Sequence, residues 1–241
     1  MGFTAAAQND ALFSDASDAY NAGDYNKAIE NYLKIIEAEQ HSAELYFNLG
    51  NSYYKLNQIA PSIYYFEKAL LLKPNDPEIL NNLGYAQNMT LDAIELMPET
   101  GLSKIYKDIT RQLSFEQWGY LTVIFMIFFV LLYIVFYFLQ YATQKRIAFI
   151  TSFVCLIIAV VSFVFAFLQF NDFQEEQPAI VFDDEVKVIA EPNNRSQTIF
   201  TLHEGTKVNV LEVLEDYQKI RIPDGQTGWL PSESIKLLKE F

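Results

Sequence analysis

Hydrophobic and polar residues follow three successive patterns along the chain. Residues 9–96 place apolar residues at helical spacing, residues 118–170 are almost continuously apolar, and residues 180–222 alternate apolar and polar positions with a period of two. Helical spacing predicts packed helices, alternation predicts half-buried strands, and a long uncharged apolar run predicts a helix that crosses a membrane. The sequence therefore predicts a multi-domain protein with an all-α array, a two-helix hairpin and an all-β domain.

The central apolar block consists of two runs, Trp118–Leu139 and Ile147–Phe170, and neither contains a charged residue. Each exceeds the roughly 20 residues that a helix rising about 1.5 Å per residue needs to cross a hydrocarbon core of about 30 Å. The first run is apolar on every face, unlike the one-sided stripe of an amphipathic helix. We therefore expect a transmembrane hairpin that keeps both flanking regions on one side, with Ser114 and Gln117 forming a capping box at its start.

Internal repetition organises the N-terminal region. A shift of 34 residues aligns Ala16 with Gly50 and Gly84, and Tyr32 with Phe66. This period, with small residues where two helices touch and an aromatic residue where they pack, is typical of tetratricopeptide repeats. We expect two complete repeats and a third first helix, which give a tetratricopeptide superhelix with helices near 9–22, 24–39, 42–56, 60–72 and 76–96.

The concave face of such an array is the surface on which tetratricopeptide proteins hold a partner. The 34-residue register places aromatic and amide side chains from the first helix of each repeat on that face. The rings would supply contact area and the amides would pair with a peptide backbone, although any single ring could instead only pack between helices. The predicted partner-binding residues are Phe13, Ser17, Tyr20, Phe47, Asn51, Tyr54, Asn81, Tyr85 and Asn88.

A short amphipathic stretch separates the array from the hairpin. Leu102, Ile105, Tyr106, Ile109 and Leu113 have helical spacing, and basic residues occupy the other faces. Such a helix could lie along the membrane surface, or it could be a final capping helix packed on the array. Both alternatives stay open at this point.

The C-terminal region reads as five or six short strands separated by turn signals, such as Pro223–Gly225. The order of its turn and packing residues resembles that of the bacterial SH3 domain: Pro192 follows the first strand, Gly205 precedes a long valine-rich strand, and Gly228-Trp229 lies near the end. The resemblance implies a small SH3-like barrel that binds proteins or cell-wall peptides. We expect Trp229 to pack in the barrel and His203 to be a solvated loop residue.

Charge and composition exclude several functions. Residues 1–117 carry 8 Lys and Arg against 16 Asp and Glu, and residues 171–241 carry 7 against 14, so both outer regions would repel nucleic acid. The single cysteine, Cys155, excludes an intrachain disulfide and a cysteine-based metal cluster. With only two histidines, His41 and His203, and no glycine-rich phosphate loop, the sequence offers no catalytic residues, cofactor site or metal site. We expect no enzyme activity, and the uncharged membrane runs also disfavour a transporter.

The start of the chain and its orientation leave alternatives open. Ala5–Ala7 before Gln8 is similar to the end of a secretory signal peptide, or it is an ordinary alanine-rich tail. Lys145 and Arg146 between the two runs place that loop in the cytoplasm, whereas the basic residues before the first run weaken the asymmetry.

The boundaries expected from these patterns cover the whole chain. They are a signal-peptide remnant at 1–8, the repeat domain at 9–100 (repeats 9–41 and 43–76, capping helix 77–96), a juxtamembrane segment at 101–113, membrane helices at 114–140 and 147–170 around a basic loop at 141–146, a linker at 171–178 and the SH3-like domain at 179–238.

This combination of repeats, membrane hairpin and terminal barrel resembles the BatE family of the Bacteroides aerotolerance (Bat) operon over almost the full length. The resemblance implies a protein of the bacterial inner membrane whose outer domains face the periplasm. It also implies protein partners, namely von Willebrand A-domain membrane proteins and a MoxR-type ATPase, in a complex tied to oxygen or envelope stress. The alternative function is a cell-wall sensor or tether whose SH3-like domain binds peptidoglycan.

Overall fold

The computed structural model describes residues 2–92, 94, 101–110, 112–193 and 195–239 of the chain. It divides into two compact units. The first combines Met1–Met97 with Gln177–Phe241, and the second is Pro98–Glu176. Two segments that are distant in sequence, the helical array and the barrel, therefore form one unit.

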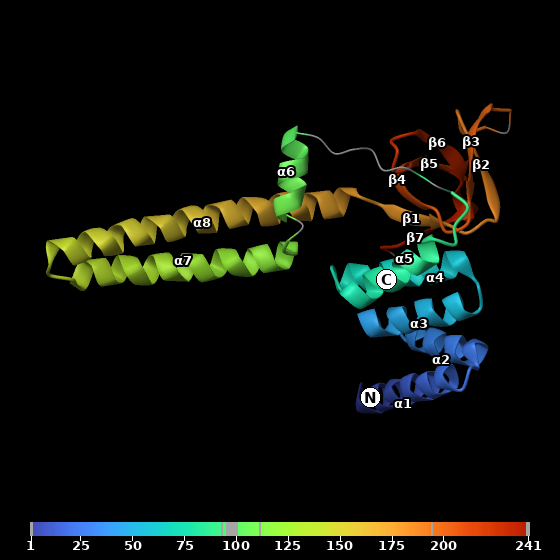
Figure 1. Cartoon of the computed structure of the whole chain (residues 1–241), viewed down its shortest axis with the longest axis horizontal. Coiled ribbons are helices and arrows are strands. Elements are labelled where there is room, and N and C mark those ends of the chain that lie inside the picture. Colours follow the sequence, from blue (N-terminus) through green and yellow to red (C-terminus); the bar gives the residue numbers. More distant parts are fainter. Residues whose placement is uncertain (1, 93, 95–100, 111, 194, 240–241) are drawn as a thin grey trace. The chain divides into compact units, whose positions relative to one another are not determined.

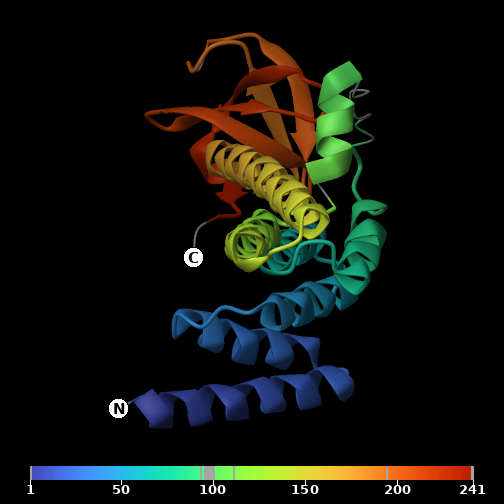
Figure 2. The same cartoon turned by 90° about the vertical axis from the view of Figure 1, so that its left-hand side faces the viewer.

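The array consists of five helices that stack in sequence order (Figures 1 and 2). Side chains before the helices satisfy backbone N–H groups that the first turn leaves free. Asp24 accepts from Lys27 N, Ser42 accepts from Leu45 N, and Asp76 accepts from the first turn of the last helix. The helices are α1 (Gly2–Asn21), α2 (Tyr25–Glu37), α3 (Ala43–Lys55), α4 (Ile59–Leu72) and α5 (Pro77–Gln87).

The 34-residue repeat is visible in how the helices pack. A Cβ atom built on Gly50 would lie 2.6 Å from the Phe66 ring, so α3 and α4 approach closely because residue 50 is glycine. Gly84 occupies the same repeat position in α5, yet nothing lies within 4 Å of its built Cβ. The contact made by Phe66 in the second repeat therefore has no counterpart among the described residues at Gly84.

The barrel is an antiparallel sheet with strand order β3-β2-β6-β5-β4-β1-β7. Its core includes Val188, Ile220 and Leu230, which are fully buried. Trp229 is 8% exposed, which confirms its packing role. The strands are β1 (Pro178–Val181), β2 (Glu185–Ile189), β3 (Thr198–His203), β4 (Lys207–Leu214), β5 (Tyr217–Arg221), β6 (Thr227–Pro231) and β7 (Ile235–Leu237), so the described residues form seven strands where the sequence predicted five or six.

The barrel packs directly on the array through what we call the array–barrel joint, formed by β1 and the end of β7 against α4. Along β1, Ala179 and Val181 enter the barrel core, whereas Ile180 between them is buried in the array core. Leu238 joins the same array core, and the Tyr64 hydroxyl of α4 donates to the Leu237 carbonyl at 3.2 Å. Both faces of β1 are thus buried, one in each domain.

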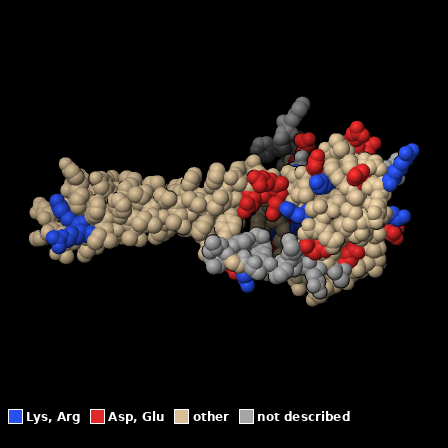
Figure 3. Space-filling view, turned by 90° about the horizontal axis from the view of Figure 1, so that it is seen from above, with Lys and Arg blue, Asp and Glu red and all other residues tan. Residues whose placement is uncertain are grey.

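The second unit holds two long apolar helices, α7 (Phe115–Phe138) and α8 (Ala142–Glu175), which pack side by side (Figure 1). Both are long and apolar enough to cross a membrane. No residue of α7 is buried, and 28% of the most apolar window of α8 is buried, whereas the core helix of a soluble protein is mostly buried. Figure 3 shows an uncharged surface along the hairpin, with basic side chains gathered at its tip.

Small residues on α8 allow the two helices to approach. The buried positions of α8 recur at alternating spacings of four and three residues, which keeps them on one face. Small side chains at such positions let membrane helices pack through close backbone contact. The buried small residues of α8 are Ala148, Ser152, Cys155, Ala159 and Ser162.

Several element boundaries differ from the sequence expectations. The expected helix 76–96 ends at Gln87, because the chain after Asn88 leaves the helix and brings Asp92 to the barrel; residues 93 and 95–96 lie outside the described residues. The expected basic loop 141–146 is mostly helical, since α8 begins at Ala142 and includes Lys145. The predicted capping box of Ser114 and Gln117 is confirmed, with both reciprocal hydrogen bonds present.

Candidate interaction surfaces

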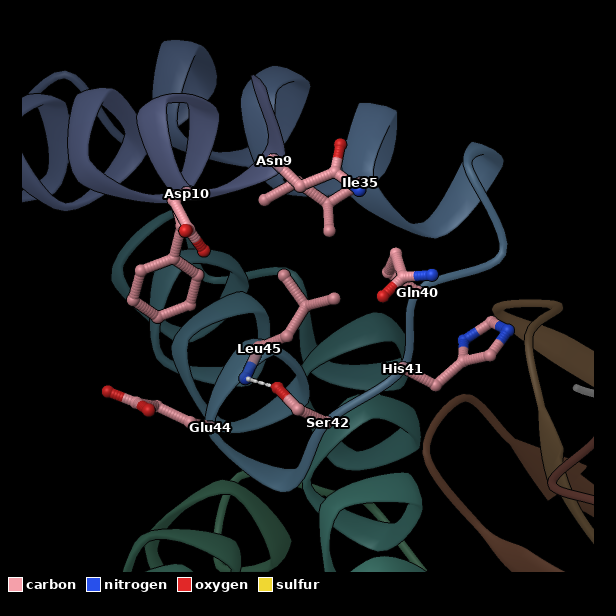
Figure 4. A pocket seen from close by; sticks show the side chains of 9 residues that line it. Asn9, Asp10, Ile35, Gln40, His41, Ser42, Glu44 and Leu45 are labelled. Atoms are coloured by element: carbon pink, nitrogen blue, oxygen red, sulfur yellow. Dashed lines mark hydrogen bonds between the residues drawn. The ribbon is translucent and has the colours of Figure 1, made fainter. Parts of the chain in front are cut away.

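Two neighbouring grooves follow the first helices of the repeats. The first has a volume of about 320 Å³ and lies between α1 and α3; Phe13, Ile35 and Leu45 supply its apolar side chains. Figure 4 shows Asp10 on α1 and Glu44 on α3 as the acidic residues of this groove. The second groove, of about 420 Å³, lies between α3 and α5 and contains Phe47. Glu44 lines both grooves, so they form one continuous surface, which we call the concave strip.

The structure distributes the nine predicted partner-binding residues over different roles. Phe13 lines the first groove and Phe47 the second, although each also contacts another ring, Tyr32 and Phe66 respectively. Asn51 accepts a hydrogen bond from Asn82 at 2.9 Å. Ser17 is hydrogen-bonded to the Tyr32 hydroxyl, and Tyr20 is in edge contact with Tyr25. Tyr54 is partly buried against the array core. The remaining three, Asn81, Tyr85 and Asn88, are exposed.

Sequence reasoning missed the carboxylates of the concave strip. Asp10, Glu44 and Glu78 are separated by 34 residues each, so they occupy the same position in three successive repeats. Glu44 and Glu78 stand in the first turns of α3 and α5. The self-alignment that found the small residues at the helix contacts contains this acidic column too. Its members were overlooked because exposed acids were assigned to the general negative charge of the surface.

A compact hydrogen-bonded cluster lies at the array–barrel joint. Asp92 accepts from the His203 ring at 2.7 Å, from the His203 backbone N–H at 2.7 Å and from the Thr206 hydroxyl at 2.6 Å. Burial acts to raise the pKa of Asp92, but the hydrogen bonds from Thr206 and His203 outweigh it and lower that pKa. The Asp92 hydrogen bond in turn raises the pKa of His203. The expectation that His203 is a solvated loop residue was therefore wrong, because a carboxylate more than one hundred residues away in sequence binds it.

A second polar contact crosses the joint between α4 and β4. Glu67 is 7% exposed and forms an ion pair of 2.6 Å with Lys207. Its neighbour Lys68 lies over the Tyr46 ring at 5.1 Å and over the Tyr64 ring at 5.4 Å. Burial raises the pKa of Tyr46 to about 12, so this ring stays neutral at ordinary pH. The joint thus combines an apolar centre with paired charges at its edge.

The short helix α6 (Gly101–Thr110) belongs to the same unit as the hairpin. Its last carbonyl, on Thr110, accepts from the Trp118 ring N–H at 3.3 Å and from the Gln169 amide at 3.2 Å. The Tyr106 hydroxyl also donates to Asp172 at 3.1 Å. These hydrogen bonds tie the end of α6 to the open end of the hairpin, where polar groups and aromatic rings meet.

Comparisons with known proteins identify two kinds of module. A tetratricopeptide repeat family matches residues 43–76 and a related TPR repeat family matches residues 18–57. The bacterial SH3 domain family matches residues 184–236. The chain carries tetratricopeptide repeats and a bacterial SH3 domain. Both are typically modules of protein interaction rather than catalysis.

A curated relative matches part of the chain. The Photosystem I assembly protein Ycf3 of Synechococcus sp. (strain CC9605) is 33% identical over 75 residues, which are 30% of this chain. The match covers 43% of the relative, so the chain spans less than half the length of that protein. The similarity therefore concerns one region of each protein.

Proposed function

We propose that the protein is a non-enzymatic, membrane-anchored scaffold in which the hairpin crosses the bilayer and the array and barrel bind partner proteins on one side. The observation that carries this proposal is the position of the hairpin within the chain. It is inserted between the array and the barrel, which nevertheless share one core through Ile180 and Leu238. Domains that share a core must lie on the same side of a membrane, and two crossings meet that requirement.

The concave strip supports a role in holding a partner. It combines aromatic rings, exposed amides and carboxylates along helices that are fixed by the array core. Such a rigid, mixed surface suits an extended or helical peptide segment. The cyanobacterial relative is named as an assembly protein, which is consistent with a role in protein interaction.

The resemblance to the BatE family specifies the membrane, the orientation and the partners that we propose for this protein. The array and barrel would face the periplasm of a bacterial inner membrane, with Lys145 and Arg146 at the cytoplasmic tip of the hairpin. The partners would be von Willebrand A-domain proteins and a MoxR-type ATPase in an envelope-stress complex. Cysteine labelling of intact cells at Glu233 and Thr143, which are both exposed, tests the orientation. Only position 233 should react with an impermeant reagent, and the reverse pattern would contradict the orientation.

A peptide display experiment tests the scaffold function directly. A library of random peptides is selected on the full chain in lipid nanodiscs, and retention of the enriched peptides is compared with the Phe13→Ala, Phe47→Ala double variant. We expect enrichment on the parent and loss of retention on the double variant, because Phe13 lines the first groove and Phe47 lines the second. Leu72→Ala, which removes an exposed apolar side chain from α4, is the control and should retain the peptides. No enrichment on the parent would refute the groove as a binding surface.

A further inference from the structure

The acidic column of the concave strip repeats together with an aromatic column. Asp10 precedes Phe13 by three residues, and Glu44 precedes Phe47 by the same interval. Residues three apart on a helix lie on the same side, so α1 and α3 each present a carboxylate beside a ring, whereas Glu78 of α5 is followed at this interval by Asn81. The first groove is lined by both members of the α1 pair, and Phe47 lines the second.

The two carboxylates of the first groove, Asp10 and Glu44, have no lysine or arginine beside them in the lining of that groove. Among the described residues, neither carboxylate takes part in a hydrogen bond or an ion pair. Ile35 and Leu45 supply apolar side chains to the same groove. An occupant that fills the groove must therefore offer both apolar surface and positive charge.

The second groove shows how a cation is held on this strip. Lys73 is bonded to Asp76 at 2.6 Å, and this hydrogen bond raises the pKa of Lys73, with smaller contributions from Glu78 and Glu44. The acids of neighbouring repeats thus favour a positive charge at this point. In the first groove, no lysine or arginine of the lining plays the part of Lys73, and the His41 ring is hydrogen-bonded to the Tyr46 hydroxyl at 2.7 Å.

A purely structural role accounts for only part of the acidic column. Glu44 and Glu78 are first-turn residues, where a negative charge is favourable near the helix N-terminus. Asp10 lies in the interior of α1, far from that end, and has no such reason to be acidic. The recurrence of the acid in all three first helices therefore points to a ligand that runs across them.

We propose that the concave strip binds an extended, positively charged peptide segment, with an apolar side chain of the segment in the groove between α1 and α3 and flanking Lys or Arg side chains paired with Asp10 and Glu44. This inference rests on the proposed scaffold function and specifies the chemistry of the partner. The apolar anchor supplies affinity and the repeated carboxylates set the register and select against acidic segments.

The display experiment separates this inference from the scaffold function. We expect the peptides enriched on the full chain in nanodiscs to carry net positive charge around an apolar residue. Enrichment of neutral or acidic peptides would overturn the inference and leave the scaffold function standing, whereas no enrichment would overturn both.

A matched pair of double variants tests the two carboxylates. Affinity for one enriched cationic peptide, measured by fluorescence anisotropy, should fall about tenfold in the Asp10→Asn, Glu44→Gln variant, since two largely exposed ion pairs are lost. The Asp15→Asn, Glu37→Gln variant removes the same net charge outside the groove and should bind as the parent does. Equal losses in both variants would show only general charge attraction and contradict the assignment.

A measurement on the unchanged protein guards against misfolding of the variants. Binding of the cationic peptide to the parent should weaken steeply as salt is raised, while binding of the same peptide with its basic residues replaced by glutamine should be weaker and independent of salt. A glutamine peptide that binds as tightly as the cationic one would refute the role of the acidic column.

Discussion

Gly205 is the residue on which the array–barrel joint can be tested most sharply. It stands between β3 and β4 with a φ of +82°, and a Cβ atom built there would lie 2.9 Å from both Ile63 Cδ1 and Thr90 Cγ2. Ile63 is fully buried, so its terminal methyl group cannot easily move aside. Gly205→Ala should therefore cost about 1–2 kcal/mol in left-handed backbone strain and about 1–3 kcal/mol in overpacking. The backbone strain is present in the docked and the undocked barrel alike, whereas the overpacking against Ile63 and Thr90 exists only when the barrel is docked. The overpacking of about 1–3 kcal/mol therefore shifts the ratio of docked to undocked barrel roughly 5-fold to 160-fold toward the undocked state.

Pulsed electron–electron resonance between spin labels measures this docking. Labels at Asp18 on α1 and Glu212 on β4, in a Cys155→Ser background, should give a narrow distance distribution in the parent and a broad one in Gly205→Ala. Gly23→Ala is the matched control, because Gly23 has a similar φ of +83° but no atom within 4 Å of its built Cβ. Hydrogen exchange of the barrel strands shows whether the barrel itself stays folded. A parental distribution in Gly205→Ala would refute the close packing described here.

Two further predictions concern the joint and the hairpin. Asp92 raises the pKa of His203 above 6.5, so protonated His203 stabilises the joint below that pH, and this stabilisation is lost as the pH rises through the raised pKa. The thermal midpoint of the parent should therefore decrease as the pH is raised from about 6 to about 9. The Asp92→Asn variant should not show this decrease. The same decrease of the thermal midpoint with pH in Asp92→Asn would contradict the pairing of Asp92 with His203. In the hairpin, Ala159→Leu should destabilise the α7–α8 contact by about 1–3 kcal/mol because Ala159 is 1% exposed, whereas Val160→Leu on the exposed face should have little effect on helix proximity measured by spin labels. Equal effects of both substitutions would argue against the small-residue face.

The sequence predicted the elements well where one local pattern decides the structure. The 34-residue period fixed the helix pairs around Gly50 and Phe66, and the alternation of residues in β4 and β5 fixed those strands. The capping box before α7 could also be predicted, because its two partners lie three residues apart.

The array–barrel joint could not be predicted in the same way, because its partners come from opposite sides of the hairpin. Asp92 looked like one more exposed acid and His203 like a turn residue, and only the fold brings them together. Ile180 gave a similar problem, since the short apolar sequence of β1 does not show what covers the second face of the strand, which is the array. The concave strip falls between these cases: its aromatic rings were predicted, and its carboxylates were recognisable from the same period but were read as solvated charge.

The insertion of the hairpin into the joint also sets an order of events during synthesis. The array leaves the ribosome first, and the surface of α4 around Ile63 stays uncovered until β1 and the segment ending at Leu238 have been made. Between these two moments the chain must thread both apolar helices into the bilayer. A newly made array therefore carries bare apolar surface that a chaperone could recognise, and completion of the C-terminus removes it.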